Sequence, residues 1–304
     1  MAVERYHEGQ VHKGFRLSEG GVDLTETRRP LRRVGIYIPG GRAAYPSSVV
    51  MTVAPAKLAG VDEIVVATPM SGFRRSPALR HVLDRLGVTE VWAMGGAHAV
   101  AAMAYGTETI GRVDKIVGPG NAWVTAAKHL VNGEVAIDGL AGPSEVLIVA
   151  SGDEVDPDWV AADLLAQAEH DPLATALLVT DRKKTSKEVS KAVARRLKGL
   201  ETAKVAKASL RGHGAAVVVD DMDTALRWVE KVAPEHLQLV GADAEALADR
   251  VRNAGAIFVG ASTPEVFGDY LAGPSHVLPT AGTARFSSAL GVEDFIRRGH
   301  IIRF

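Results

Sequence analysis

Two polar residues three positions apart, Gln167 and His170, end the segment Ala162-Asp-Leu-Leu-Ala-Gln-Ala-Glu-His170. We expect this segment to be helical, and residues three apart project from the same side of a helix. An amide oxygen and an imidazole nitrogen are ligands that Zn²⁺ or Mn²⁺ accepts, so the pair would supply half of a metal site. The alternative is an ordinary solvated helix face, so other parts of the chain must supply partners.

A glutamate followed by a histidine, Glu235-His236, directly precedes the alternating residues Leu237-Gln-Leu-Val240. At the start of a strand, the imidazole can act as a general base. The adjacent carboxylate can raise its basicity or activate a water. The alternative is a histidine at a helix end beside a surface glutamate.

Further candidates lie after the last predicted strand and before a central one. Asp269 and His276 fall in a glycine-rich loop, and loops of this kind often line sites. Asp269 would complete an oxygen and nitrogen ligand set with Gln167 and His170, without any sulfur. Ser144 begins the apolar strand 145–150 and could bind a substrate amine.

Three glycine turns each follow a predicted strand: Pro39-Gly-Gly41, Gly95-Gly96 and Gly118-Pro-Gly-Asn121. Glycine lets backbone amides approach a ligand, and the helix that follows offers unpaired N–H groups to an anion. The turns predict a nucleotide or phosphate site, although no G-x-G-x-x-G or Walker A motif is present. Tight connections without a ligand remain the alternative.

Strands alternate with helices along most of the chain, which is typical of parallel sheets covered by helices on both faces. We therefore predict an α/β fold of two tandem, doubly wound (Rossmann-like) units, divided near Gly139-Leu-Ala-Gly-Pro143. The strands are expected at 33–38, 63–68, 91–94, 115–117 and 135–137, and then at 145–150, 175–180, 215–219, 237–240 and 256–259.

Composition excludes several classes of function. The 304 residues include 35 Lys and Arg against 36 Asp and Glu, so no overall field favours nucleic acid or acidic membranes. The local basic cluster Arg182-Lys-Lys184 is interpreted as solvated surface. No cysteine is present, which excludes disulfides, thiolate metal sites and a thiol nucleophile. No signal peptide or long apolar run is visible, so we expect a soluble, cytoplasmic protein.

Eight segments together resemble the histidinol dehydrogenase family, the zinc- and NAD-dependent enzymes that complete histidine biosynthesis. The resemblance covers about Arg32 to Arg298 and is specific because the segments occur in register. They are Gly35-Ile-Tyr-Ile-Pro-Gly-Gly41, Ala104-Tyr-Gly-Thr107, Gly118-Pro-Gly-Asn121, Ala141-Gly-Pro-Ser-Glu145, Ala162–His170, Ala233-Pro-Glu-His-Leu237, Gly268-Asp-Tyr270 and His276-Val-Leu-Pro-Thr280.

The resemblance implies an aldehyde-dehydrogenase-like architecture, a homodimer, and oxidation of an amino alcohol to a carboxylate with two NAD. It implies that Gln167, His170 and Asp269 bind zinc and that Glu235 and His236 form the acid–base pair. These five residues would also contact the substrate, together with Ser144 and His276. Tyr37, Asn121 and the residue at position His98 would contact NAD. Because no thiol can form a hemithioacetal, the aldehyde must be hydrated before the second hydride leaves.

The alternation of strands and helices divides the chain into an arm at 1–31, an α/β domain at 32–141, a second α/β domain at 142–286 and a C-terminal helix at 287–304. The resemblance assigns NAD binding to the first α/β domain and the metal and substrate to the second. The chain departs from the family pattern at His98, where a glutamine is usual, and at Gly273-Pro-Ser-His276, where Gly-x-Asn-His is usual.

We expect a shortened member, without the family's N-terminal helical region and without the C-terminal tail that supplies a further zinc-ligand histidine and a substrate-binding glutamate. Three interpretations follow from this expectation. The chain is a compact dehydrogenase for histidinol or a related amino alcohol, a non-catalytic relative that binds a nucleotide or a partner protein, or an enzyme whose tail comes from a separate chain.

Overall fold

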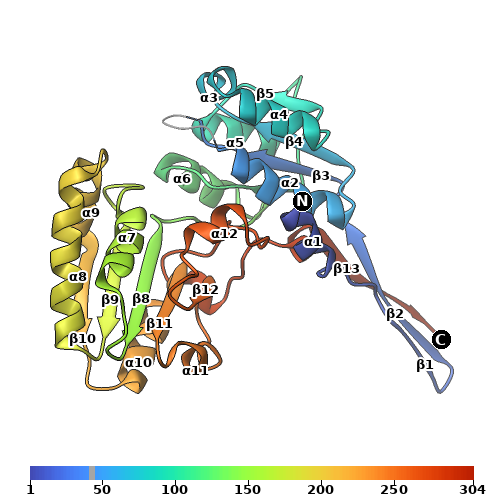
Figure 1. Cartoon of the computed structure of the whole chain (residues 1–304). Coiled ribbons are helices and arrows are strands. Elements are labelled where there is room, and N and C mark those ends of the chain that lie inside the picture. Colours follow the sequence, from blue (N-terminus) through green and yellow to red (C-terminus); the bar gives the residue numbers. More distant parts are fainter. Residues whose placement is uncertain (41–44) are drawn as a thin grey trace. The chain divides into compact units, whose positions relative to one another are not determined.

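The structure is a computed structural model that describes residues 1–40 and 45–304, except for the side chains of Asp269 and Tyr270. The chain forms two compact units (Figure 1). Unit 1 contains Met1–Leu140, Asp269–Val277 and Leu290–Phe304, and unit 2 contains Ala141–Gly268 and Leu278–Ala289. Within the described part of the chain, no helix is long and apolar enough to cross a membrane.

The main sheet of unit 1 is entirely parallel, with the strand order β5-β4-β3-β6-β7. Its helices cover both faces, because successive side chains of a strand point to opposite sides. Val34 and Ile36 of β3 pack with α2 and α4, whereas Tyr37 packs with α5 and α6. The elements are β3 (Arg33–Tyr37), α2 (Pro46–Ala59), β4 (Glu63–Ala67), α3 (Met70–Arg75), α4 (Pro77–Arg85), β5 (Glu90–Trp92), α5 (Gly96–Tyr105), β6 (Lys115–Val117), α6 (Ala122–Val131) and β7 (Ala136–Ile137).

The sheet of unit 2 is also parallel and has the equivalent order, β10-β9-β8-β11-β12. Helices α7, α8 and α9 cover one face, and α10 and α11 cover the other. The elements are β8 (Glu145–Ser151), α7 (Pro157–Ala168), β9 (Thr175–Thr180), α8 (Lys183–Arg196), η1 (Leu197–Gly199), α9 (Ala203–His213), β10 (Gly214–Val218), α10 (Met222–Val232), β11 (His236–Gly241), α11 (Ala244–Ala248), β12 (Ala256–Val259), α12 (Val266–Tyr270), whose last two residues belong to unit 1, and η2 (Thr283–Arg285). The prediction of two doubly wound α/β units is therefore confirmed.

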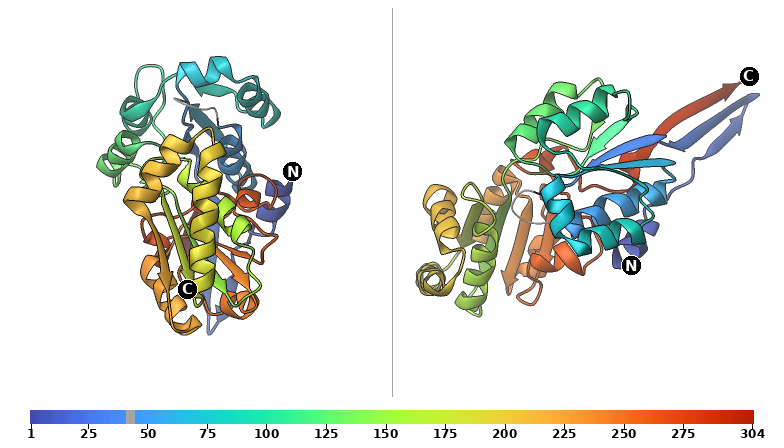
Figure 2. Two further views of the ribbon diagram at one scale, coloured as in Figure 1. Left: turned by 60° about the vertical axis from the view of Figure 1, so that its left-hand side comes forward. Right: turned by 90° about the horizontal axis from the view of Figure 1, so that it is seen from above.

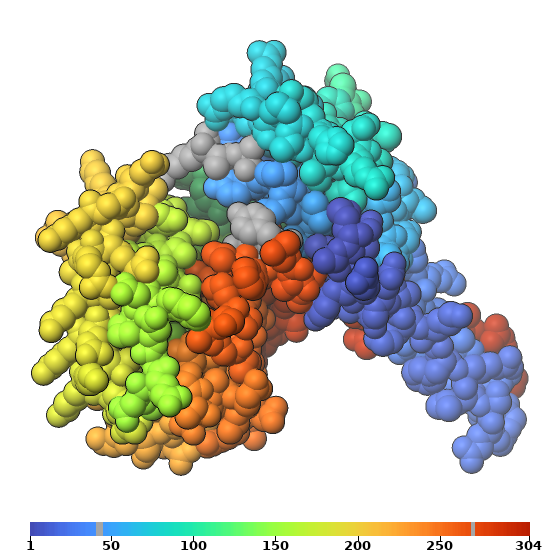
Figure 3. Space-filling view, in the orientation of Figure 1, coloured from blue at the N-terminus to red at the C-terminus, as the bar shows by residue number. Residues whose placement is uncertain are grey.

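Long side chains project from the surface of residues 183–213, which form the outer helices of unit 2 (Figure 3). Arg182, Lys183 and Lys184 are all exposed. This basic cluster is solvated surface, as expected from the sequence.

The prediction of a helix at 287–304 is wrong. The structure has a short 3-10 helix, η3 (Val292–Phe295), followed by a strand, β13 (Ile296–Arg303). The strand pairs antiparallel with β2 (Val22–Pro30), which also pairs with β1 (Arg16–Glu19), and the three form an extended ribbon (Figure 2). Gly299 and the isoleucines of this segment disfavour a helix, and the distant partner β2 supplies the strand ladder instead.

The first residues of the chain form α1 (Ala2–Glu8), which packs against α2 through Val3, Met51 and Ala54. The N-terminal arm therefore consists of a helix followed by the two ribbon strands β1 and β2, all within unit 1.

Candidate functional site

Glu235 and His236 lie where β11 begins, beside the first residue of β8. The side chain of Glu235 is buried, and its Oε2 accepts a hydrogen bond from the backbone N–H of Glu145 at 2.9 Å. Nδ1 of His236 lies 3.0 Å from the backbone carbonyl oxygen of Glu145. A carbonyl oxygen only accepts, so Nδ1 must donate. In the neutral ring Nε2 is then the basic atom, and the peptide groups of Glu145 hold both members of the acid–base pair.

Two carboxyl groups lie close to this imidazole, and the side chain of Glu145 has a partner of its own. Oε2 of Glu235 lies 3.7 Å from Nδ1 of His236, and Oε2 of the buried Glu265 lies 4.0 Å from it. Oε1 of Glu145 accepts a hydrogen bond from the N–H of Ala281 at 3.1 Å. Burial raises the pKa of Glu145 above its ordinary value of 4.5, and the Ala281 bond opposes the shift. The carboxyl groups of Glu235 and Glu265 therefore lie close enough to influence a proton that the imidazole accepts.

Gln167 and His170 lie at the end of α7. This helix runs from the carboxyl end of β8 to the amino end of β9, so both residues come to the edge of the sheet at which β8 and β11 begin. Gln167 is only 2% exposed. Its side-chain amide makes no hydrogen bond to any described residue, whereas His170, just beyond the helix, is exposed. An amide that makes no hydrogen bond within the described part of the protein can bind a ligand.

The remaining predicted metal and substrate residues are placed as follows. Ser144 is half-buried and immediately precedes β8. Asp269 belongs to α12 in unit 1, and its side chain lies outside the described set. His276 is half-buried in the loop after α12, also in unit 1. Groups of three or more His, Cys, Asp or Glu arranged for a metal are absent among the described residues. The zinc ligand set and the substrate contacts stay predictions.

Asp163 lies one turn before Gln167 on α7 and connects this helix to β11. Nε2 of Gln238 donates to Oδ2 of Asp163 at 2.7 Å, and Gln238 is 1% exposed. Burial raises the pKa of Asp163 above its ordinary value, and the bond from Gln238 opposes the shift. The contact ties the helix that carries the candidate ligands to the strand that carries the acid–base pair.

The predicted nucleotide residues lie at the carboxyl edge of the unit 1 sheet. Chain connections leave β3 and β6 in opposite directions there, and open α/β sheets bind ligands at such switch points. The hydroxyl oxygen of Tyr37 accepts a hydrogen bond from the N–H of Gly96 at 3.1 Å. Gly118 follows β6 with φ +112°, and a Cβ there would lie 2.2 Å from the carbonyl oxygen of Tyr37. The glycine turns after β5 and β6 thus both contact Tyr37.

Asn121 caps α6, with Oδ1 accepting from the N–H groups of Trp123 and Val124 at 3.1 and 3.2 Å. His98 is exposed in the first turn of α5. Gly41, in the first predicted glycine turn, lies outside the described residues. The contacts of Tyr37, His98 and Asn121 with NAD stay predictions.

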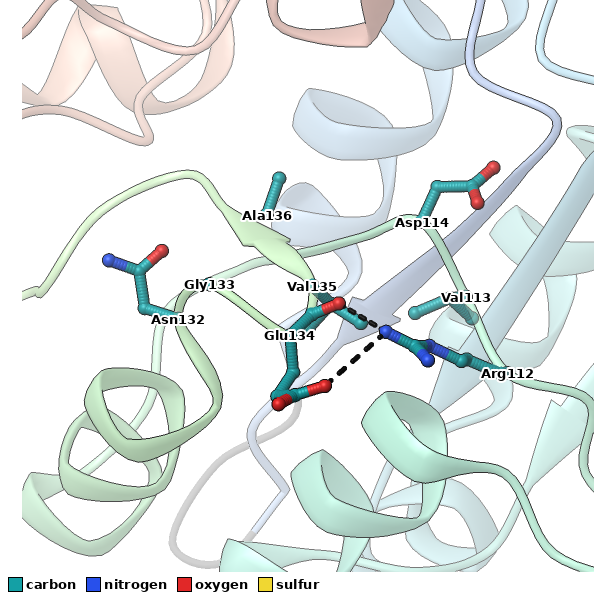
Figure 4. A pocket seen from close by; sticks show the side chains of 8 residues that line it. All are labelled: Arg112, Val113, Asp114, Asn132, Gly133, Glu134, Val135 and Ala136. Atoms are coloured by element: carbon teal, nitrogen blue, oxygen red, sulfur yellow. Dashed lines mark hydrogen bonds and ion pairs between the residues drawn. The ribbon is translucent and has the colours of Figure 1, made fainter.

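A cavity of about 490 Å³ lies at the opposite edge of the unit 1 sheet (Figure 4). Residues 112–114 and 132–136 line it, just before β6 and β7 begin. Arg112 and Glu134 form an exposed ion pair on its wall. The cavity is therefore separate from the predicted nucleotide edge, where β3 and β6 end.

Sequence reasoning missed two residues beside the acid–base pair: Glu145, whose peptide groups bind both side chains, and Glu265. Glu145 directly follows Ser144 and was assigned only to a strand. Its position at the start of a buried run is the one sequence signal for a special role, because carboxylates are rarely buried without a partner. Glu265 carries no comparable signal, since the chain segment after β12 returns it to His236.

Comparison with known proteins agrees with this geometry. The family model for histidinol dehydrogenase matches residues 1–304. Histidinol dehydrogenase of Rhizobium meliloti (strain 1021) is 53% identical over 302 residues, which cover 99% of this chain and 69% of the relative. That of Rhodospirillum rubrum is 52% identical with the same coverage of both chains.

Solved structures give the same result. The crystal structure of histidinol dehydrogenase from Elizabethkingia anophelis superposes with a TM-score of 0.94 at 36% identity, covering 99% of this chain and 70% of that one. Betaine aldehyde dehydrogenase from Staphylococcus aureus shares only the fold, with a TM-score of 0.65 at 12% identity over 98% of this chain and 73% of its own. The chain belongs to the histidinol dehydrogenase family.

Proposed function

We propose that this protein oxidises L-histidinol through histidinal to L-histidine, the reaction of histidine biosynthesis, with NAD as the hydride acceptor. The observation that carries the proposal is the Glu235–His236 pair, whose two side chains are held by the peptide groups of a single residue, Glu145. The family match supports the substrate and the reaction. We also infer a cytoplasmic homodimer, as the resemblance to the family implies.

Zinc fits the residues at the end of α7. Gln167, His170 and Asp269 would hold the ion, and the side chain of Gln167, which makes no hydrogen bond to a described residue, supports this assignment. When bound, zinc would supply a Lewis acid that polarises the substrate oxygen and fixes its orientation. Ser144 and His276 would complete the substrate contacts.

The protein's own groups account for the proton transfers. In the first oxidation Nε2 of His236 takes the proton of the alcohol while hydride leaves the carbinol carbon for NAD, which gives the aldehyde. Glu235 then accepts a proton from a water molecule that adds to the aldehyde carbon. His236 returns its first proton to the aldehyde oxygen, which completes the hydrate. The hydrate then loses a second hydride to a second NAD and a proton to His236, which gives the carboxylic acid, and the acid ionises to the carboxylate. Water must add because no cysteine is available as the nucleophile.

The alternative of a non-catalytic relative that binds a nucleotide or a partner protein is not favoured. The family model extends over the whole chain, and the acid–base pair is held in a defined geometry.

The test is the yield of NADH and product from L-histidinol. Wild-type protein should give two NADH per histidinol. His236→Asn should abolish both oxidations, whereas Glu235→Gln should keep the first better than the second and release histidinal with about one NADH. His213→Asn and Glu245→Gln, both exposed in unit 2, are the matched controls and should behave as wild type. Removal of metal with a chelator should stop turnover, and zinc should restore it. Equal losses of both oxidations in Glu235→Gln would contradict the division of roles, and an inert, metal-free wild-type protein would contradict the function.

A further inference from the structure

A buried ion pair in unit 1 binds the backbone of a single residue. The side chains of Lys128 on α6 and Asp138 after β7 are 4% and 7% exposed and form a salt bridge. Nζ of Lys128 also donates to the carbonyl oxygen of Gly118 at 3.1 Å. Oδ2 of Asp138 accepts from the N–H of the same glycine at 2.6 Å. Both polar groups of Gly118 are thus held by one pair of buried charges.

The stability of the fold does not by itself explain such a pair. Desolvating two charges is unfavourable, and replacing a buried ion pair by apolar side chains of similar size is often neutral or stabilising. The side chains nevertheless lie where Val124, Ala127 and Val131 already provide apolar packing. What the pair supplies, and apolar residues could not, is a fixed orientation of the peptide groups at Gly118.

That orientation matters because Gly118 opens the turn at the switch point of the sheet. Its φ of +112° and its close approach to Tyr37 leave no room for a side chain. The turn continues through Pro119, Gly120 and Asn121 into α6. Among the described residues, the N–H groups of Gly120 and Asn121 have no hydrogen-bond partner, so they remain available to a ligand.

We propose that Lys128 and Asp138 are positioning residues of the nucleotide site. They bind the N–H and the carbonyl oxygen of Gly118, and this fixes the turn 118–121 so that its remaining N–H groups can bind NAD. The inference rests on the proposed function, in which this turn binds NAD. Neither residue touches the substrate, so their loss should weaken NAD binding and leave the chemistry at Glu235 and His236 unchanged.

The decisive variant is the double replacement Lys128→Met with Asp138→Leu, measured in the full chain. Apolar replacement keeps the packing and removes both hydrogen bonds to Gly118. We expect urea unfolding close to that of the wild type, whereas the Kd and KM for NAD should rise about tenfold. The kcat at saturating NAD and the KM for histidinol should stay within about twofold, a split that a merely structural role would not give.

A second variant keeps the test informative if the double variant does not fold. Asp138→Asn retains an oxygen that can accept from Gly118, and it should raise the KM for NAD less than Asp138→Ala does. Arg112→Met removes an exposed ion pair of the same unit and is the matched control. A folded double variant, or an Asp138→Ala variant, that binds NAD as tightly as wild type would overturn the inference and leave the proposed function intact. Failure of the wild type to bind NAD would overturn both.

Discussion

Asp163 and Gln238 form a contact between α7 and β11 that one substitution should strengthen. Gln238 donates through Nε2 to Asp163, but its Oε1 is buried without a hydrogen-bond partner among the described residues. An ionised carboxylate can only accept, so Asp163 cannot satisfy this oxygen. Asparagine has the same shape and carries both an acceptor and a donor. In Asp163→Asn, we expect the side-chain oxygen to keep the existing bond and Nδ2 to donate to Oε1 of Gln238.

The size of the gain follows from the burial of the two groups. A buried polar group without a partner costs about 1–3 kcal/mol, and Gln238 is 1% exposed. Asp163→Asn should therefore raise the free energy of unfolding of unit 2 by about 1–2 kcal/mol at neutral pH. Asp163→Ala leaves both polar atoms of the Gln238 amide unpaired and should lower it by about 2 kcal/mol or more.

The gain should depend on pH, because burial raises the pKa of Asp163 above its ordinary value of 3.8. Between the unfolded and the folded pKa, the folded protein binds more protons than the unfolded one. The free energy of unfolding of the wild type therefore falls as pH rises through this window. At lower pH the protonated carboxyl can itself donate to Gln238. The advantage of Asp163→Asn should be full at neutral pH and should shrink as the solution is acidified through the raised pKa.

The assay is urea unfolding followed by circular dichroism, at neutral pH and in steps down to about pH 4. Asp158→Asn on the same helix is the matched control. Hydrogen bonds from Arg195 and then Arg196 lower the pKa of Asp158, so the stability due to its charge is present above pH 3.8 and is lost on acidification. The two substitutions should therefore differ in sign. A less stable Asp163→Asn at neutral pH, or a difference independent of pH, would refute the reasoning.

Three further substitutions test unit 1. Gly118→Ala should lower the free energy of unfolding by at least about 1–3 kcal/mol, because Gly118 has a positive φ and an added Cβ would overlap with Tyr37. A variant that unfolds in urea as the wild type does would contradict this. Arg33→Met should cost about 1.5–3 kcal/mol at neutral pH. Burial by itself would raise the pKa of Glu90. Hydrogen bonds from Arg33 and Trp92, together with the charge of Arg33, outweigh burial and lower the pKa below 4.5. The difference between wild type and Arg33→Met should therefore disappear as pH falls through the lowered pKa, and a difference that persists in acid would contradict it. Asn121→Ala should cost about 1 kcal/mol through loss of the α6 cap and should weaken NAD binding, whereas Asn121→Asp should retain the cap, as thermal unfolding with and without NAD would show.

The parts of the fold that could be predicted are those whose signal is local. Buried parallel strands appear in the sequence as short apolar runs, and the glycine turns mark where each strand passes into a helix. The strand β13 could not be recognised, because β2, with which it pairs, lies some 270 residues earlier in the chain. We did not predict helix α9 from the sequence, because its two lysines, Arg211 and other exposed residues leave only a narrow apolar face.

The candidate site was predictable in its residue types but not in its contacts. The dipeptide Glu235-His236 indicates acid–base chemistry because both groups transfer protons. That Nδ1 of His236 donates, and that Nε2 is therefore the base, depends on a carbonyl of β8 that lies 91 residues away. The spacing of Gln167 and His170 is local to a helix and could be predicted, but the absence of a hydrogen-bond partner for Gln167 is visible only in the folded chain.

Both units use a buried carboxylate to fix a backbone N–H beside the predicted site: Asp138 binds Gly118 in unit 1, and Glu235 binds Glu145 in unit 2. This has a consequence for Glu235, which must hold the backbone and also activate water. Glutamine at this position can still accept from Glu145 through its oxygen, so Glu235→Gln should leave the His236 geometry in place. The loss of the second oxidation in that variant would then report proton transfer, because the peptide that orients the histidine is still held.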